Sequence, residues 1–499
     1  MKIIIIGAGI AGLSSYLFLN KHLIHNCPDQ HQIKVYEAYD IRRMKYDAPG
    51  ATSGPKETVE PLFTPKVIGN AIGIGKNGLS VISRIDERGE LARKYIERGN
   101  NVSKWKMGTA RGWKIIDASV QSAAKDDKVG SDQPVNTVMI ARQVAWEVLR
   151  DEVLNIDNEA VAQKRIEKIT TQEDGTVLVK FTDETEDVAD LLIGADGLKS
   201  IVRRTMFVDH DDHYPQSWVD SITRKDSKKK DYITPHYEGL TGLGGFVPSS
   251  VLKGTGYQQE AMAITFGPNG FFGHGYIGPV DQITDDSAPL AAWWSTIPSK
   301  DPHPWQTSDT GASKDSFDRE AAVQELLKRH RFSADPAIQA ILDYLEKHEA
   351  IEHSYPTYTT PELPTWSQGS NMVLVGDAAH ALQPSSGQGA CQALEDAEAL
   401  ALLLKHYLHS PYVEGTGSSQ AANIEKALHK YVELRKPRLA KIYKRSQKMS
   451  SLKMQMNIVE EYLMYSIIWV ASRMRGWKAY NDELFEYDVP AEVARIVKD

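Results

Sequence analysis

The chain has 499 residues, 41% of them hydrophobic and 25% charged, which is typical of a globular protein with two or three domains. Its formal net charge of −8 argues against non-specific binding to nucleic acid. The two cysteines, Cys27 and Cys391, lie far apart and form no CxxC or Cys/His cluster, so we expect neither a disulfide framework nor a metal site.

The chain opens with a predicted strand, a glycine-rich turn and a helix. Four isoleucines in the strand Lys2–Ile6 run into Gly7, Gly9 and Gly12, and the helix is predicted over 10–23. In such a pattern the first glycine permits a tight turn, the second lets the backbone approach a diphosphate, and the third lets the helix lie close to the sheet. The helix N-terminus then favours the negative charge of the diphosphate.

A second predicted strand, over 32–38, carries Glu37 at its tip. A carboxylate there can accept hydrogen bonds from a ribose and would repel a 2′-phosphate. These residues therefore predict an adenine dinucleotide with a free ribose, either NAD or FAD. Because the first strand begins directly after Met1, we expect no signal or transit peptide, and a reducing location such as the cytosol.

The rest of the chain alternates strand–helix units with one β-rich region. We expect loops over 40–69 and 118–134 and a solvated basic loop over 224–230. In chain order we predict a strand running into a helix over 138–153, strands over 161–184 and 189–197, an antiparallel sheet over 237–298, two helices over 319–347 split near residue 335, a strand, loop and long helix over 371–404, and a helical tail from 423.

The most apolar late stretch is "YLMYSIIWVA", residues 462–471. It is about half as long as the roughly 20 residues that a membrane span needs. We therefore predict a buried helix there and no membrane span.

Two further motifs accompany the opening. "LLIGADGLKSIVRR" (191–204) and "VLVGDAAHALQPSSGQGACQALEDA" (373–397) are both apolar strands that end in an Asp-containing turn. Together with the opening and "ARQVAWEVL" (141–149), they resemble the class A flavoprotein monooxygenases, the group of para-hydroxybenzoate and salicylate hydroxylases. The resemblance spans nearly the whole chain and implies that the bound dinucleotide is FAD.

The resemblance also implies the architecture, an α/β fold in which a Rossmann-type FAD-binding domain is interleaved with an antiparallel-sheet substrate domain. Helices would follow at the C-terminus. The expected parts are 1–205 as the first part of the FAD-binding domain, with loop insertions at 40–68 and 118–134, 206–370 as mainly the substrate domain, 371–410 as the returning FAD-binding segment, and 411–499 as the helical region.

Residue roles follow from the same resemblance. Asp377 would bind the FAD ribose region, Asp196 would handle both FAD and NADPH, and Arg142 would lie along the FAD. The backbone of 387–390 would meet the pyrimidine edge of the flavin, and 69–72 would pass nearest its ring. A helix N-cap is the alternative for Asp196 and Asp377, and a surface ion pair is the alternative for Arg142. The complete expected cofactor set is Gly7, Gly9, Gly12, Glu37, Gly69, Ala71, Arg142, Asp196, Asp377, Gly387, Gly389 and Ala390.

Two departures from the family pattern stand out. Position 391 is Cys where many members have Asn, which we interpret as packing. The loop over 40–66 is longer and more charged than in the simplest members, and this bears on flavin mobility and substrate entry.

The chemistry that the resemblance implies needs no protein nucleophile. NAD(P)H would visit transiently and reduce FAD, and O₂ would form a flavin C4a-hydroperoxide that transfers oxygen to the substrate. Arg203 and Tyr237 are the catalytic candidates, because they could stabilise a phenolate or bond a substrate hydroxyl. Their alternatives are an arginine tied to the flavin domain and a core tyrosine. His380 is interpreted as a packed loop residue, and "WWSTIP" (293–298) only faintly resembles a halogenase signature.

We therefore predict an FAD-dependent, NAD(P)H-consuming monooxygenase that hydroxylates or epoxidises an aromatic or polyketide/terpenoid-like small molecule. One alternative is an FAD oxidase or oxidative cyclase on the same scaffold. The other is a non-redox flavoprotein that serves as a binding or cyclisation scaffold.

Overall fold

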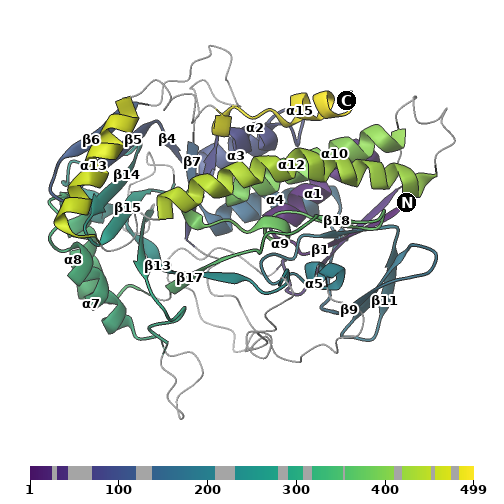
Figure 1. The fold of residues 1–499 in the computed structure, drawn as a ribbon, viewed down its shortest axis with the longest axis horizontal. Coiled ribbons are helices and arrows are strands. Elements are labelled where there is room, and N and C mark those ends of the chain that lie inside the picture. Colours follow the sequence, from purple (N-terminus) through teal and green to yellow (C-terminus); the bar gives the residue numbers. More distant parts are fainter. Residues whose placement is uncertain are drawn as a thin grey trace, which may run out of the picture.

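The protein is described by a computed structural model, in which two large sheets are covered by helices (Figure 1). Gly69, Cys27, the basic run 224–230 and most of the two expected loop insertions lie outside the described residues. The described residues are 1–24, 31–42, 70–119, 137–207, 231–278, 290–306, 317–351, 354–409, 419–450, 456–473 and 483–498.

The first large sheet is parallel apart from one edge strand. Its order is β18 (Ser367–Gln368), β19 (Met372–Leu374), β12 (Leu191–Gly194), β1 (Lys2–Ile6), β2 (Gln32–Glu37) and β8 (Val161–Gln163). Ile5 of β1 pairs with Ile193 of β12, which pairs in turn with Val373 of β19. Strands from the start, middle and end of the chain thus lie side by side. This confirms an α/β nucleotide-binding fold whose chain leaves and returns.

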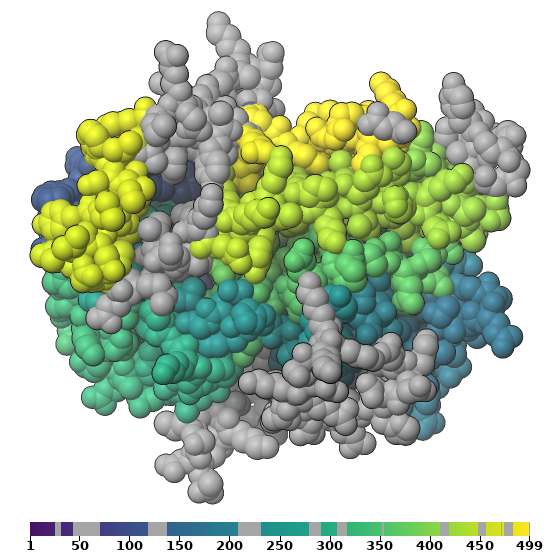
Figure 2. Space-filling model, viewed as in Figure 1, coloured from purple at the N-terminus to yellow at the C-terminus, as the bar shows by residue number. Residues whose placement is uncertain are grey.

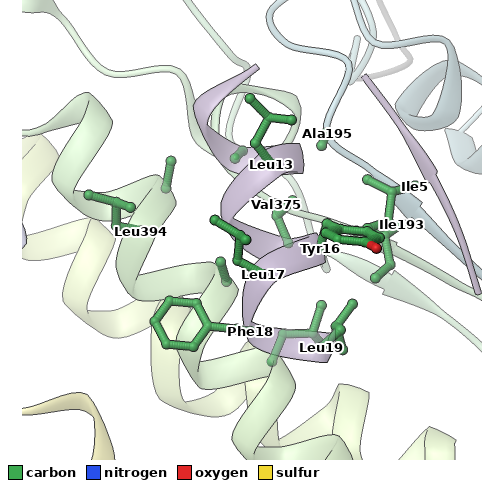
Figure 3. Close-up of a cluster of buried hydrophobic side chains, with 14 of the residues drawn as sticks. Ile5, Leu13, Tyr16, Leu17, Phe18, Leu19, Ile193, Ala195, Val375 and Leu394 are labelled. Atoms are coloured by element: carbon green, nitrogen blue, oxygen red, sulfur yellow. The ribbon is translucent and has the colours of Figure 1, made fainter. Parts of the chain in front are cut away.

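Helix α1 (Ile10–Leu19) is buried on almost every side, between this sheet and α10 (Gly389–His409). In Figure 3, Tyr16 points toward Ile5 and Ile193 on the strands, whereas Leu17 points toward Leu394 of α10. A helix that is apolar all round belongs in a core, which explains why α1 has no polar face. The short π-helical turn η1 (Asn20–Ile24) continues it.

Smaller elements complete this half of the molecule. One three-stranded sheet has the order β3 (Ala71–Gly75), β7 (Thr137–Ala141), β4 (Asn100–Val102), and the other has the order β11 (Glu186–Ala189), β10 (Val177–Phe181), β9 (Ile166–Thr171). The helices are α2 (Lys76–Ser83), α3 (Glu90–Arg98), α4 (Arg142–Ile156) and α5 (Ile201–Phe207).

The second large sheet has seven strands and is antiparallel except where β14 and β5 pair. Its order is β17 (Ser354–Thr359), β13 (His236–Pro248), β16 (Leu290–Pro298), β15 (Gly270–Tyr276), β14 (Ala261–Gly267), β5 (Lys104–Thr109) and β6 (Lys114–Ser119). The antiparallel sheet predicted over 237–298 is therefore present. Two of its strands, β5 and β6, come from the segment that we expected to belong to the FAD-binding domain.

The two faces of this sheet pack against different partners. Trp293 and Phe272 pack against α7 (Arg319–His330) and α8 (Pro336–His348), with the turn η2 (Ser249–Leu252) alongside. Phe246, Met262 and Trp294 lie on the opposite face, against the core of the nucleotide-binding half. The face that carries Trp294 is thus the one turned toward the nucleotide-binding half.

The C-terminal region is helical, as predicted, with α12 (Gln420–Ser450), α13 (Ile458–Arg473) and α15 (Val489–Ile496). The prediction that 462–471 is a buried helix is wrong in one respect, because Leu463 is 58% and Ile467 is 59% exposed. The reason is its location, because α13 packs on β6 at the rim of the sheet (Figure 1), where only one of its sides contacts described elements. Among the described helices, none is both long and apolar enough to cross a bilayer.

Candidate cofactor and active site

The glycine-rich turn after β1 has the conformation and the close packing that its sequence predicts. Gly7 has φ +99°, and a Cβ there would lie 2.6 Å from the carbonyl oxygen of Ala195. A Cβ on Gly12 would lie 1.9 Å from the carbonyl oxygen of Gly7. Gly9 differs, because no described heavy atom lies within 4 Å of its Cβ position. The backbone at the start of α1 is therefore open to a ligand at Gly9.

Glu37 lies at the end of β2 beside this turn. Its Oε2 accepts a hydrogen bond from the amide of Ala8 over 2.8 Å, and its Oε1 accepts one from Tyr39 over 3.2 Å. Trp146 of α4 supports the turn from the other side, since its indole N–H donates to the Ala8 carbonyl over 2.7 Å. Each carboxylate oxygen of Glu37 retains a second lone pair, which suits a ribose hydroxyl.

The turn after β19 packs directly on α1. Gly376 has φ +59°, and a Cβ there would lie 2.8 Å from the Cβ of Ala11. Asp377 then begins α9 (Asp377–His380), with a half-buried carboxylate that accepts no hydrogen bond from any described residue. The N-terminal turn and the segment that begins at Gly376 are thus in contact, although they come from opposite ends of the chain.

The chain continues through the turn η4 (Pro384–Ser386) to the start of α10. Gly387 has φ +60°, and no described heavy atom lies within 4 Å of the Cβ position of Gly387 or Gly389. Gly389 and Ala390 are the first two residues of α10, a 21-residue helix. Unpaired N–H groups and the positive end of the helix dipole therefore lie at an open stretch of backbone.

Asp196 follows β12, and its two carboxylate oxygens differ in their hydrogen-bond partners. Its Oδ2 accepts hydrogen bonds from the amides of Ile201 (2.7 Å) and Val202 (3.2 Å) in the first turn of α5, which resembles the capping alternative, although Ser200 occupies the N-cap position and accepts from the Arg203 amide. Its Oδ1 is buried and has no partner among the described residues. Burial raises the pKa of Asp196, and hydrogen bonds from Ser200 and from the backbone amides counter the rise only in part. An orphaned buried acceptor is costly, so Oδ1 fits a site for a ligand hydroxyl.

Arg142 and Ala71 lie together at the junction of the two halves. Ala71 begins β3 and pairs with Ala141, and Arg142 begins α4 with an exposed side chain. Asn70 joins them, because its carbonyl oxygen accepts from the Arg142 amide over 3.1 Å. Its side-chain Nδ2 donates to the Trp293 carbonyl oxygen over 3.0 Å, which fastens β3 to the second sheet. Sequence reasoning placed Asn70 inside the stretch 69–72 but gave its side chain no role, although the lone amide in "GNAIGIG" was the available signal.

Arg203 is completely buried in a set of backbone contacts. Its guanidinium donates to the carbonyl oxygens of Ala378 (2.8 Å), Leu198 (2.5 Å) and Ile233 (3.1 Å), and burial lowers its pKa to about 10. These contacts connect the turn after β12 with α9, and they match the alternative of an arginine tied to the flavin domain. A catalytic role for Arg203 stays a prediction.

Tyr237, the other catalytic candidate, lies near the start of β13 and is half-buried. Its hydroxyl is 2.9 Å from Thr241 Oγ1 and 3.0 Å from the Ser299 carbonyl oxygen, and its ring is packed against Tyr358. These contacts hold Tyr237 within its own sheet, and its catalytic role also stays a prediction.

A buried ionic network lies behind the turn and was not foreseen. Glu395 and Asp396 of α10 bind Arg435 of α12, and Glu395 also binds Arg438. His380 belongs to the same network, with Nε2 2.5 Å from Asp396 Oδ2, which agrees with its interpretation as a packed residue. The available signal was the pair of acidic residues inside the apolar stretch "ACQALEDAEALALLL".

These features fit FAD, and comparison with known proteins agrees. The model of the family described as "FAD binding domain" matches residues 319–446. Salicylate hydroxylase from Pseudomonas putida is 27% identical over 463 residues, covering 89% of this chain and 84% of that protein. The FAD-dependent monooxygenase paxM from Penicillium paxilli is 25% identical over 430 residues, covering 86% of this chain and 76% of its own.

Solved structures share the fold. A salicylate hydroxylase substrate complex has a TM-score of 0.65 at 18% identity and covers 100% of this chain and 98% of that chain. HpxO from Klebsiella pneumoniae, complexed with FAD and uric acid, has a TM-score of 0.64 at 18% identity, with 100% and 97% coverage. The chain therefore contains a match to the FAD binding domain and is similar over most of its length to salicylate hydroxylase and to fungal FAD-dependent monooxygenases.

Proposed function

We propose that the protein uses NAD(P)H and O₂ to hydroxylate or epoxidise a flat aromatic or polyketide/terpenoid-like small molecule. The observation that carries the proposal is the contact between the two cofactor turns, where Gly376 meets Ala11 of α1. Because these turns adjoin, one FAD molecule can reach both of them. When bound, FAD reduced by NAD(P)H reacts with O₂ and supplies the oxygen atom for transfer.

The chain's own residues hold the cofactor in this proposal. Glu37 accepts from the adenosine ribose, and the open backbone at Gly9 receives the diphosphate at the N-terminus of α1. The unpartnered oxygen of Asp196 and the carboxylate of Asp377 accept hydroxyl donors of FAD. Arg142, with its exposed side chain at the head of α4, lies along the cofactor.

The start of α10 has an electrostatic role. Gly387, Gly389 and Ala390 present backbone amides at the positive end of a long helix. These amides favour negative charge on the pyrimidine side of the flavin. Because they already point there, the protein need not rearrange when that charge develops. A side chain at 387 or 389 would occupy the space that the backbone now leaves open.

The sheet face toward the nucleotide-binding half supports a flat substrate. Trp294 has a glycine opposite it on each neighbouring strand, Gly244 on β13 and Gly273 on β15. Its indole lies over Gly273, where a Cβ would be 2.2 Å from Cε2 of the ring. The ring is half-buried, and its N–H donates to none of the described residues. It can therefore pack against a flat molecule and donate to an oxygen of that molecule.

The relatives of this chain agree with this substrate class. One relative is a salicylate hydroxylase, and one structural neighbour is complexed with uric acid. Salicylate and uric acid are both small, flat ring systems.

The proposal is tested by reconstituting the purified protein with FAD and following NAD(P)H consumption with a panel of phenols and polycyclic aromatics under ¹⁸O₂. A monooxygenase incorporates one labelled atom into product. An oxidase or oxidative cyclase forms product without label. A non-redox scaffold shows no substrate-dependent NAD(P)H consumption, and its function survives Asp196→Ala. Either of the last two results would refute the proposal.

A further inference from the structure

Helix α13 has two faces of opposite character. Glu461, Met464 and Tyr465 are buried against the rim of the seven-stranded sheet. Val459 is 72%, Leu463 58% and Ile467 59% exposed. These residues, together with Val470, follow the i, i+4, i+8, i+11 spacing of one helix side. The cofactor site does not account for this exposed apolar side.

The helix is fastened to the sheet rather than loosely attached. Arg111, in the turn between β5 and β6, binds both oxygens of Glu461 over 3.0 and 2.9 Å. The Tyr465 hydroxyl is 2.7 Å from Glu461 and 3.1 Å from the Phe266 carbonyl oxygen. Asn457 accepts from the amides of Val459 and Glu460 and so caps the helix. The apolar side is therefore presented to the surroundings in a fixed orientation.

Aromatic side chains flank this apolar side. Tyr462 and Trp469 lie on the same helix, and Trp113 in the turn between β5 and β6 meets the Tyr462 ring edge-on at 5.4 Å between centroids. Trp113 is itself 53% exposed. Two separate elements thus bring tryptophan and tyrosine to one surface, the arrangement that suits the boundary between water and lipid.

Two exposed basic side chains lie at the edge of the surface. Residues 462–473 include no acidic side chain and end in Arg473, whose guanidinium lies 4.0 Å from the centroid of the Trp469 ring. Lys114, beside Trp113, has an 84% exposed side chain, with its Nζ 3.8 Å from the carboxylate of Asp117 on the same strand. The nearby acid Glu460 is at the N-terminal end of the helix, where it accepts from the Asn457 amide. This basic edge contrasts with the net charge of −8 of the whole chain.

We propose that α13 and the β5–β6 turn form a membrane-docking surface that lies in the headgroup region of an anionic phospholipid bilayer. The 16-residue helix lies parallel to the bilayer and inserts Val459, Leu463, Ile467 and Val470 among the upper acyl chains. Lys114 and Arg473 pair with lipid phosphates. The proposal does not depend on the proposed function, because none of these residues belongs to the cofactor site.

Charge favours lipid over a second copy of this chain. A second copy would offer this surface the same apolar side and the same basic residues, Lys114 and Arg473, and no phosphate groups to pair with them. An anionic bilayer complements both the apolar side and its basic edge.

The test is co-sedimentation of the FAD-loaded protein with vesicles of phosphatidylcholine alone and of phosphatidylcholine mixed with phosphatidylserine. We expect the protein to sediment with the mixed vesicles. Leu463→Ser combined with Ile467→Ser should lower the partition coefficient about tenfold or more, since two apolar side chains no longer insert. Lys114→Glu should lower binding to the mixed vesicles about fivefold or more and leave binding to phosphatidylcholine nearly unchanged.

The matched control is Ile156→Ser combined with Val188→Ser, two exposed apolar residues away from α13, which should bind vesicles like the wild type. Flavin content and melting temperature are measured for every variant, so loss of fold or of FAD is separated from loss of docking. Failure of the wild type to bind either vesicle would overturn the proposal. So would a dimer that the Leu463/Ile467 double variant dissociates, because a second copy would then occupy the surface.

Discussion

Arg435 of α12 lies between two carboxylates of α10, with its Nε 2.8 Å from Asp396 Oδ1 and its Nη1 2.6 Å from Glu395 Oε2. All three side chains are fully buried. The other oxygen of Asp396 accepts from the amide of Gly376 over 2.9 Å. A C-terminal helix is thereby joined through one carboxylate to the turn that leads into Asp377.

Replacing Arg435 should therefore weaken both the fold and the cofactor site. Arg435→Met leaves two buried carboxylates with less compensation, and we expect a loss of about 3–5 kcal/mol in the free energy of unfolding. FAD affinity should fall as well, because the Gly376 turn loses its support. Lys441→Met is the control, since Lys441 and its partner Glu483 are exposed and such pairs contribute about 1 kcal/mol or less. Urea unfolding and FAD titration measure both effects, and equal losses in the two variants would contradict the argument.

The same network predicts a pH dependence of stability. Burial alone would raise the pKa of Asp396, but the charges of His380 and Arg435 outweigh it and hold the pKa below its usual value. The unfolded chain therefore binds a proton at Asp396 more readily than the folded chain. This contribution is complete above the unfolded pKa and is lost as the pH falls through the folded pKa.

Asp396→Asn removes that titration. Between about pH 5 and pH 3 the free energy of unfolding of the wild type should fall more steeply than that of the variant, although the variant is less stable at pH 7. Comparing the two slopes cancels groups common to both proteins. Parallel slopes would show that Asp396 titrates alike in the folded and unfolded states.

Two variants of Asp196 can distinguish a role in capping α5 from a role in binding the cofactor. Asp196→Asn retains an oxygen that can cap α5 and loses the charge, whereas Asp196→Ala loses both. If FAD hydroxyls donate to the unpartnered Oδ1, the Ala variant should bind FAD about tenfold or more weakly, and the Asn variant should lie between it and the wild type. Asp174→Ala, which alters a turn between two strands, is the control. Unchanged FAD affinity in the Ala variant would leave Asp196 only as a cap.

Cys391 should behave as an inert core residue. Its thiol is fully buried on α10, where a Cβ at Gly78 would lie 2.8 Å from its sulfur, and burial raises its pKa to about 12. Compared with the ordinary value of 9.0, the thiolate fraction near neutral pH falls about a thousandfold. In a Cys27→Ser background, Ellman's reagent should label Cys391 readily only after unfolding. Fast labelling of the folded protein would contradict the packing interpretation.

Sequence patterns predicted the parts of the site that depend on local backbone requirements. The turns at Gly7 and Gly376 and the strand end at Glu37 were predictable because glycine positions and apolar runs encode them over a few residues. The acidic partners of Arg435 were not predictable, because their ion pairs with Arg435 depend on how α12 packs along α10. The exposed side of α13 was missed for a similar reason: hydrophobicity shows that a helix is apolar and does not show which sides other elements cover.

The pairing between strands that are distant in the sequence was equally unpredictable from sequence patterns. β5 joins β14 in parallel, from Lys104 opposite Ala261 onward, and no local pattern links two segments so far apart. The backbone contacts of Arg203 also arise from tertiary packing, since Ala378 and Ile233 belong to other segments. Such contacts explain why the sequence could not show where the Arg203 side chain points.

Gly273 and Trp294 provide a paired test of the substrate face. Ala at 273 would place its Cβ 2.2–2.4 Å from Cε2, Cζ2 and Nε1 of the Trp294 ring, so the ring must shift. Gly273→Ala should therefore cost about 1–3 kcal/mol of stability and raise KM for flat aromatic substrates. Trp294→Leu should raise the same KM through loss of the ring. Because Leu lacks the clashing atoms, the double variant should be no worse than Trp294→Leu, which is strong non-additivity in a double-mutant cycle.

Stability and steady-state kinetics with one aromatic substrate measure the cycle. Additive losses would mean that the indole does not lie over Gly273, and an unchanged KM in Trp294→Leu would remove this ring from the substrate site.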